Sequence, residues 1–175
     1  QLFIGKTTEK QSDKDFNLRL YAARKITEHT IYNSKLSEAK FFYVPSLSTK
    51  IIIFKGLLKP EHINEYYLDL YDSVLDTRLA LVHQRFSTNT FPTWDLAQPF
   101  RYMCHNGEIN TLRGNISRMF SREEIMESPL FGDDIKKIMP TILRGKSDSA
   151  TLDMVLELLL ITGRSLPEAM MMLVP

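Results

Sequence analysis

The chain has 175 residues, of which 43% are hydrophobic and 25% are charged. This balance is typical of one globular unit that can bury a core without disulfide or metal support. The 22 basic and 21 acidic residues leave a formal net charge of +1, and no basic stripe is present, so neither nucleic acid nor a membrane is an expected partner. The single cysteine, Cys104, excludes an internal disulfide and favours a reducing compartment such as the cytoplasm.

The first part of the chain alternates strand-like and helix-like patterns. Residues 1–6 look like a strand and lack the features of a signal peptide. The spacing of apolar side chains predicts a strand at residues 18–21 and a helix at residues 22–31. Aromatic and β-branched runs at residues 41–44 and 51–54 flank turn-forming residues, and they predict two further strands.

The middle of the chain repeats this alternation. Pro60 suits the first turn of a helix whose apolar face lies within residues 63–70. The continuous apolar run at residues 79–82 predicts a strand covered on both faces. Residues 100–105 repeat that arrangement and end at an Asn-Gly dipeptide suited to a turn with positive φ. Apolar residues at helical spacing then predict a helix over residues 109–120.

Two more helices are predicted towards the C-terminus. Ser147 can cap a helix that carries its apolar residues between 152 and 159 and stops at Gly163. Residues 165–168 form a capping box that opens another helix. Both ends of the chain look truncated, and the mixture of paired strands with helices predicts an α+β fold in which sheets face helices.

Three groups could carry chemistry. Arg85 follows an apolar run, where its guanidinium could bind a carboxylate by two parallel hydrogen bonds; a structural ion pair or a surface position explains it as well. The Asn106 side chain and the Gly107 backbone N–H could both donate to one oxyanion, although an Asn-Gly pair is also a common turn. Asp148 could accept from an ammonium group, or could favour a helix N-terminus.

Cys104 and the histidines are weaker candidates. Cys104 precedes His105, but neighbouring residues on a strand point to opposite faces, so a buried structural cysteine is the preferred interpretation. His83 and His105 lack a metal-ligand spacing, and neither a metal site nor a cofactor site is predicted within the chain.

Two long segments carry a family resemblance. Residues 83–94 (HQRFSTNTFPTW) and 105–115 (HNGEINTLRGN) resemble the large subunit of glutamate synthase, in its class II glutamine amidotransferase domain. Shorter matches lie at residues 42–48 (FYVPSLS) and 147–150 (SDSA). The similarity covers nearly the whole chain, so that residues 1–175 are expected to form part of one amidotransferase domain.

The resemblance assigns a role to each of the candidate groups. It implies that Arg85 holds the α-carboxylate of glutamine and that Asp148 holds its α-ammonium group. It implies that the Asn106 amide and the Gly107 N–H form the oxyanion hole around the side-chain carbonyl. This agrees with the local chemistry, because a zwitterion needs opposite charges at separate points.

Further expectations rest on the resemblance alone. Phe86 and Thr88 occupy positions that resemble secondary substrate contacts. Class II amidotransferases use an N-terminal cysteine as nucleophile, with its own α-amino group as the base. Residue 1 here is Gln1 and Cys104 does not match the nucleophile's position, so the chain is expected to lack the nucleophile and to be inactive alone.

The resemblance also implies an architecture and a wider reaction. The expected fold is the αββα four-layer sandwich of N-terminal nucleophile hydrolases. In the intact enzyme, ammonia released from glutamine would pass to a synthase domain that converts 2-oxoglutarate to glutamate, using FMN and an iron–sulfur cluster. The implied partners are the rest of the amidotransferase domain, the synthase domain and a small reductase subunit or ferredoxin; the electron donor is not specified.

Two alternatives stay open on the sequence alone. Another class II amidotransferase, such as the purine-pathway phosphoribosyl enzyme or asparagine synthetase, would share the same residue roles, although the residues flanking the two motifs speak against it. A non-catalytic module that binds glutamine or glutamate without hydrolysing it describes the activity expected of the isolated chain better.

Overall fold

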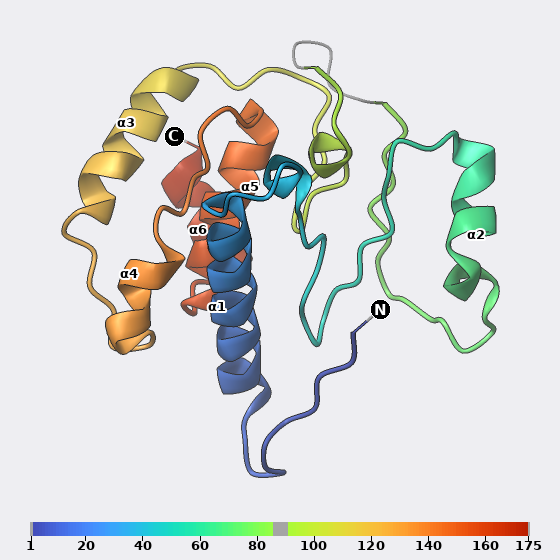
Figure 1. The fold of residues 1–175 in the computed structure, drawn as a ribbon, viewed down its shortest axis with the longest axis horizontal. Helices are drawn as coiled ribbons and strands as arrows, with labels where there is room; N and C mark the ends of the chain where they lie inside the picture. The colour runs from blue at the N-terminus through green and yellow to red at the C-terminus, as the bar shows by residue number, and fades with distance from the viewer. Residues whose placement is uncertain (1, 86–90, 175) are drawn as a thin grey trace.

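The structure is a computed structural model that describes residues 2–85 and 91–174. Figure 1 shows most of the helices gathered on one side, with one helix and long irregular segments on the other. The six α-helices of the described residues are α1 (Asp13–Tyr32), α2 (Ile63–Tyr66), α3 (Leu112–Glu123), α4 (Ile135–Ile138), α5 (Asp148–Ile161) and α6 (Leu166–Leu173). Five short 3-10 turns accompany them: η1 (Ala39–Phe41), η2 (Pro60–His62), η3 (Leu68–Tyr71), η4 (Trp94–Leu96) and η5 (Gly132–Asp134).

Helix α1 begins at a capped N-terminus and buries a face of mixed character. The Ser12 hydroxyl accepts from the backbone N–H of Asp15, which satisfies one of the free donors of the first turn. The buried residues recur at helical spacing, apolar in the first half and charged in the second. They are Phe16, Asn17, Leu20, Tyr21, Arg24, Lys25, Glu28 and His29.

The C-terminal helices have the predicted caps. Ser147 caps α5 by accepting from the N–H of Ala150, and Gly163 follows the helix with φ of +106°. Ser165 caps α6 by accepting from the N–H of Glu168. The predictions of these two helices are therefore confirmed.

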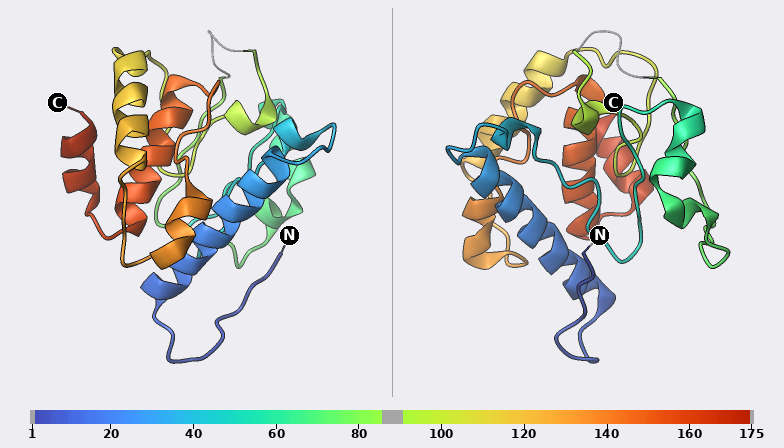
Figure 2. Two further views of the ribbon diagram at one scale, coloured as in Figure 1. Left: turned by 60° about the vertical axis from the view of Figure 1, so that its left-hand side comes forward. Right: turned by 45° about the vertical axis from the view of Figure 1, so that its right-hand side comes forward.

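Helices α1 and α5 pack together, with α4 against α1 and α6 against α5. Figure 2 shows the same neighbours from two other directions. The main apolar core lies where these helices meet, and it consists of Tyr21, Phe131, Ile135, Ile138 and Leu158. Helix α2 lies apart from this group, beside η2 and η3. No helix within the described residues is long and apolar enough to cross a membrane.

The predicted strands are wrong for this structure, and the αββα sandwich is not confirmed. Within residues 2–85 and 91–174, no segment has strand pairing, including residues 2–6. A strand needs a partner backbone for its N–H and C=O groups. The runs at 51–54 and 79–82 have none there. Ile52 is exposed (56%) while its neighbours in the first run are half-buried, and the second run faces solvent, with Leu79 75% and Val82 83% exposed.

Two other strand predictions fail for different reasons. Residues 18–21 lie inside α1, because their apolar side chains join the helix face that continues to Tyr32. Residues 100–105 form a turn, closed by a hydrogen bond from the Phe100 N–H to the Met103 carbonyl. Part of the predicted 41–44 strand is the turn η1.

The remaining helix predictions are partly right. The helix predicted over residues 22–31 is present as the second half of α1, and the helix predicted over 109–120 is present as α3, three residues later at its start. Pro60 does open a helical turn, but that turn and α2 together extend only to Tyr66, so the long apolar face predicted to residue 70 does not form.

Candidate functional site

A hydrogen bond joins the two long sequence motifs. His83 Nε2 lies 2.7 Å from Asn106 Oδ1. The side chain of His83 is half-buried, and its other ring nitrogen, Nδ1, is buried without a partner among the described residues. Arg85, two residues further along the chain, is exposed. The contact therefore brings the segment that carries Arg85 against the proposed oxyanion-hole residue.

The backbone immediately before Asn106 is held at both of its polar groups. The His105 N–H donates to Gln98 Oε1 at 2.6 Å, and the Gln98 amide donates to the His105 carbonyl at 2.8 Å. His105 Nδ1 lies 3.1 Å from the Ser149 hydroxyl on α5. The motif is thus attached both to the loop at Gln98 and to the start of α5.

Gly107 is favoured by close packing and not by its backbone angle. Its φ is not positive, in contrast to the prediction for this turn. A Cβ at this position would lie 3.0 Å from Nε2 and 3.3 Å from Cε1 of His105. The His105 ring also contacts Ser149, so a side chain at position 107 would have to displace this ring by a few tenths of an ångström, and glycine avoids that shift.

Asp148 completes the connection between the motif and α5. Its Oδ2 accepts from the Ile109 N–H at 2.8 Å, while its Oδ1 accepts from the N–H and hydroxyl of Ser149 at 2.6 and 3.0 Å. A carboxylate offers about four acceptor positions. Three are used here, which leaves one on Oδ2 for a further donor.

The structure thus links three of the segments that hold predicted site residues. Hydrogen bonds join His83 to Asn106 and the residues flanking Gly107 to the first turn of α5, where Asp148 lies. Asn106, Gly107 and Arg85 are exposed and Asp148 is half-buried. Phe86 and Thr88 lie outside the described residues.

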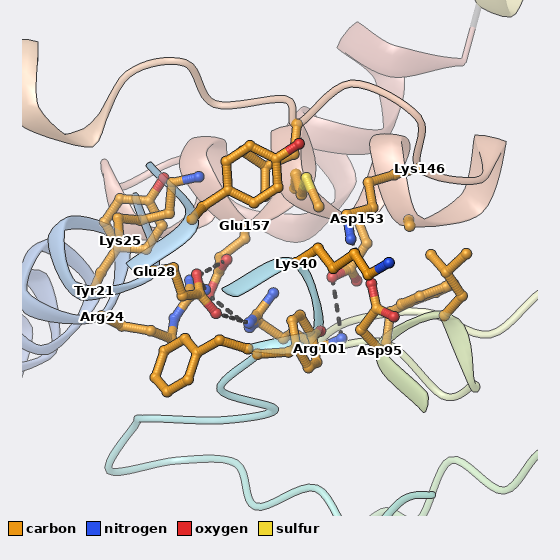
Figure 3. Close-up of a pocket in the computed structure, with 18 residues that line it drawn as sticks. Tyr21, Arg24, Lys25, Glu28, Lys40, Asp95, Arg101, Lys146, Asp153 and Glu157 are labelled. Carbon is orange, nitrogen blue, oxygen red and sulfur yellow. Dashed lines mark hydrogen bonds and ion pairs between the residues drawn. The ribbon is translucent and has the colours of Figure 1, made fainter. Parts of the chain in front are cut away.

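A buried network of charged side chains lies beneath this region, where α1 meets α5 (Figure 3). Arg24 contacts Glu28 at 2.9 Å and Glu157 at 2.5 Å. Arg101 contacts the same two carboxylates at 3.4 and 3.6 Å and donates to the Val44 carbonyl at 2.6 Å. The two arginines and two glutamates therefore balance each other's charges, which buried ions require.

Asp153 extends the network to the backbone that leads to the motif. Its two oxygens accept from the N–H groups of Arg101 and Tyr102, at 3.1 and 2.8 Å. Burial raises the pKa of the Asp153 carboxyl to about 6, although these two donors and the Arg101 charge act in the opposite direction. Helix α5 therefore holds this segment at both Asp153 and Ser149.

Lys55 holds the other side of the same loop. Its ammonium donates to the carbonyls of Asp95 and Ala97 at 2.8 and 2.7 Å and lies over the rings of Tyr43 and Phe100. Burial and the nearby Arg101 charge lower its pKa to about 7. The cavity among these charged residues has a volume of about 30 Å³. About 10–15 Å³ of such space is enough for one water molecule, so this cavity can hold water but is far too small for an amino acid.

Sequence reasoning did not identify the residues that hold the motif in place. Gln98 and Ser149 are polar residues without a local pattern, and their contacts depend on how distant segments meet. Asp153 and Glu157 lie four residues apart on a helix predicted mainly from apolar residues. Residues four apart lie on the same face of a helix, so this spacing could have indicated an acidic face of α5 that packs against basic side chains.

The whole chain matches the family model of class II glutamine amidotransferases, over residues 1–175. The chain therefore belongs to this family. The match includes the two motifs, the loop between them and the start of α5.

The chain is similar to several glutamate synthases. The chain is 46% identical over 175 residues to the large chain of glutamate synthase [NADPH] from Bacillus subtilis, covering 100% of this chain and 11% of that protein. It is 50% identical over 178 residues to glutamate synthase [NADH] from Saccharomyces cerevisiae, covering 99% and 8%. It is 42% identical over 175 residues to the chloroplastic ferredoxin-dependent glutamate synthase from Oryza sativa, covering 100% and 11%. The chain thus spans about a tenth of the length of these relatives.

Proposed function

We propose that this chain is the glutamine-binding and oxyanion-hole part of the glutaminase domain of a glutamate synthase. The observation that carries the proposal is the set of hydrogen bonds that joins His83 to Asn106 and Ile109 to Asp148. These bonds gather the segments whose residues suit the two ends and the carbonyl of one glutamine molecule. The family match over residues 1–175 supports the same reaction.

The substrate would be held by opposite charges at its amino-acid end. Arg85 presents an exposed guanidinium that can bind the α-carboxylate through two parallel hydrogen bonds. Asp148 has one acceptor position left on Oδ2, which suits one N–H of the α-ammonium group. Phe86 and Thr88 are proposed as secondary contacts on the basis of the family resemblance.

Asn106 and Gly107 would act on the reacting carbonyl. Attack of a thiolate on the amide carbon places negative charge on the carbonyl oxygen, and two preorganised N–H donors stabilise that charge. Ammonia then leaves, a thioester remains, and water hydrolyses it to glutamate. The roles of Asn106 and Gly107 require only donors that are already in place before the attack.

The nucleophile is proposed to lie outside these 175 residues. Cys104 is the single cysteine of the sequence, and it lies half-buried in the turn before His105. We expect the 175-residue chain alone to bind glutamine without releasing ammonia. A glutamine- or glutamate-binding module is therefore the second candidate, for the chain by itself.

The rest of the reaction is assigned to other parts of a longer enzyme. The ammonia would be transferred to 2-oxoglutarate in a synthase domain, in the cytoplasm, with FMN and an iron–sulfur cluster. Such clusters are held by several cysteine thiolates, and one cysteine does not suffice, so the cluster does not fit this chain. The electron source, a reductase subunit or ferredoxin, is not distinguished, because relatives named for NADPH, NADH and ferredoxin are 46%, 50% and 42% identical.

The family also supports a proposal about architecture. The half-buried run at residues 51–54 and the exposed run at 79–82 are rich in β-branched and leucine side chains. We propose that these runs become strands of an αββα sandwich when other parts of the amidotransferase domain provide partner backbones. Pairing would bury the side chains of Ile52, Leu79 and Val82 and satisfy the backbone groups between them.

The binding proposal is tested with Arg85→Ala. Removing the guanidinium should weaken glutamine binding by at least about 1.5–3 kcal/mol, or roughly 10- to 150-fold in Kd, because the charged hydrogen bonds to the α-carboxylate are lost. Isothermal titration calorimetry on the 175-residue chain measures this. Arg78→Ala, at an exposed arginine seven positions earlier, is the matched control.

Three results would count against the proposal. Equal affinities for the two variants would remove Arg85 from the site. Absence of glutamine binding by the unaltered, folded chain would overturn its role as a binding unit. Robust ammonia release by the chain alone would show that its nucleophile is present.

A further inference from the structure

The contact between His83 and Asn106 has a defined chemical direction. Asn106 Oδ1 can only accept a hydrogen bond, so His83 Nε2, 2.7 Å away, must carry the hydrogen and donate it. His83 Nδ1 is buried and has no partner in the described part of the chain. Among residues 2–85 and 91–174, nothing accepts a hydrogen from Nδ1, so the neutral form with hydrogen on Nε2 alone fits these surroundings.

This direction fixes which face Asn106 presents. A carboxamide is planar, with its oxygen on one side and its NH₂ group on the other. When the oxygen is occupied by the histidine donor, the NH₂ group is turned away from His83. A half-turn of the amide would place its NH₂ group against the Nε2–H, donor against donor, and would present an oxygen to any ligand.

The surrounding contacts hold the backbone at Asn106 and leave the rotation of its side-chain amide as the main freedom of this residue. Gln98 holds both backbone groups of His105, directly before Asn106. Ser149 contacts the His105 ring, and that ring lies against Gly107. The position of the Asn106 backbone is thereby set by its neighbours, whereas the direction of its side-chain amide depends on His83.

We propose that His83 is a positioning residue of the glutaminase site, whose Nε2–H orients the Asn106 amide so that its NH₂ group faces the oxyanion. This inference rests on the proposed function. His83 touches no reacting atom, so its removal should affect the transition state far more than the binding of glutamine, which depends on Arg85 and Asp148.

The test compares His83→Leu with His83→Gln in the full-length protein that carries this segment, by steady-state glutaminase kinetics. Leucine removes the donor and should lower kcat by roughly tenfold or more, since loss of a whole oxyanion donor costs about 10²–10³-fold. The KM for glutamine should change less than about twofold. Glutamine places an N–H near the position of Nε2 and should restore most of kcat. His62→Leu, at an exposed histidine, is the control and should leave kcat unchanged.

A second measurement does not depend on turnover. Nitrogen-15 NMR of the 175-residue chain, with the His83→Gln variant used for assignment, should show neutral His83 with its hydrogen on Nε2. Hydrogen on Nδ1 alone would overturn the inference, as would full activity of His83→Leu or equal kcat losses in the leucine and glutamine variants. A full-length protein without glutaminase activity would instead overturn the proposed function.

Discussion

Removing either arginine of the buried network should destabilise the protein strongly and by different amounts. Arg24→Met takes the nearest cation from both Glu28 and Glu157, at 2.9 and 2.5 Å. Arg101→Met removes the longer contacts, at 3.4 and 3.6 Å, together with the hydrogen bond to the Val44 carbonyl. Both side chains are almost wholly buried, so water cannot replace the lost partner.

The magnitudes follow from what each substitution leaves behind. Breaking a buried ion pair costs about 3–5 kcal/mol, because an uncompensated charge remains in a low-dielectric interior. Arg24→Met should fall near the upper end of this range. Arg101→Met should cost about 3 kcal/mol, since Arg24 still forms the two shorter ion pairs with Glu28 and Glu157. Urea unfolding followed by circular dichroism at 222 nm measures both values on this helical structure.

An exposed pair provides the control. Arg164 and Glu168 lie 2.6 Å apart, with their side chains 50% and 48% exposed, so Arg164→Met should leave the unfolding midpoint unchanged within experimental error. Similar losses for Arg164→Met and Arg24→Met would refute the reasoning from burial. A larger loss for Arg101→Met than for Arg24→Met would refute the reasoning from distance.

Two further predictions concern pH and strand pairing. Folding lowers the pKa of Lys55 from 10.5 to about 7 and that of Lys25 from 10.5 to about 8. Between pH 8 and pH 10 the folded chain therefore binds fewer protons than the unfolded chain. The free energy of unfolding should rise over this range. In Lys55→Met this rise should be smaller, by up to about 1.4 kcal/mol per pH unit. If the unfolding free energy, measured with urea at each pH, rises equally with pH in both proteins, the lowered pKa of Lys55 is contradicted. If residues 51–54 and 79–82 pair with other parts of the amidotransferase domain, isotope-edited infrared spectra of segmentally labelled full-length protein should show a strand band at these runs. An unchanged, unpaired band there would reject the proposed sandwich.

Local signals in the sequence predicted α5 and α6 correctly, and α1 and α3 in part. The caps at Ser147 and Ser165 act within three residues of themselves, so their hydrogen bonds do not depend on the rest of the fold. The strands could not be predicted in the same way. A run such as residues 79–82 has the composition of a buried strand, but it becomes one only when another backbone lies beside it.

The chemistry of the side chains predicted the candidate site residues, but not the residues that hold them in position. Arg85, Asn106, Gly107 and Asp148 were chosen because charges and donors suit glutamine, and their functional roles stay predictions. The contact of Gln98 with His105 spans seven residues, and that of His105 with Ser149 spans 44. Such contacts arise from the packing of distant segments, which no local pattern in one sequence encodes.

The ion pair between Arg24 and Glu157 also bears on the order of folding. The two residues are 133 positions apart, and every candidate site residue lies within the loop that they close. Closing a loop of this length costs about 4 kcal/mol of chain entropy before any contact inside it contributes. During synthesis, α1 must therefore wait for α5 to emerge, and the glutamine site can be completed only after nearly all of the 175 residues have been made.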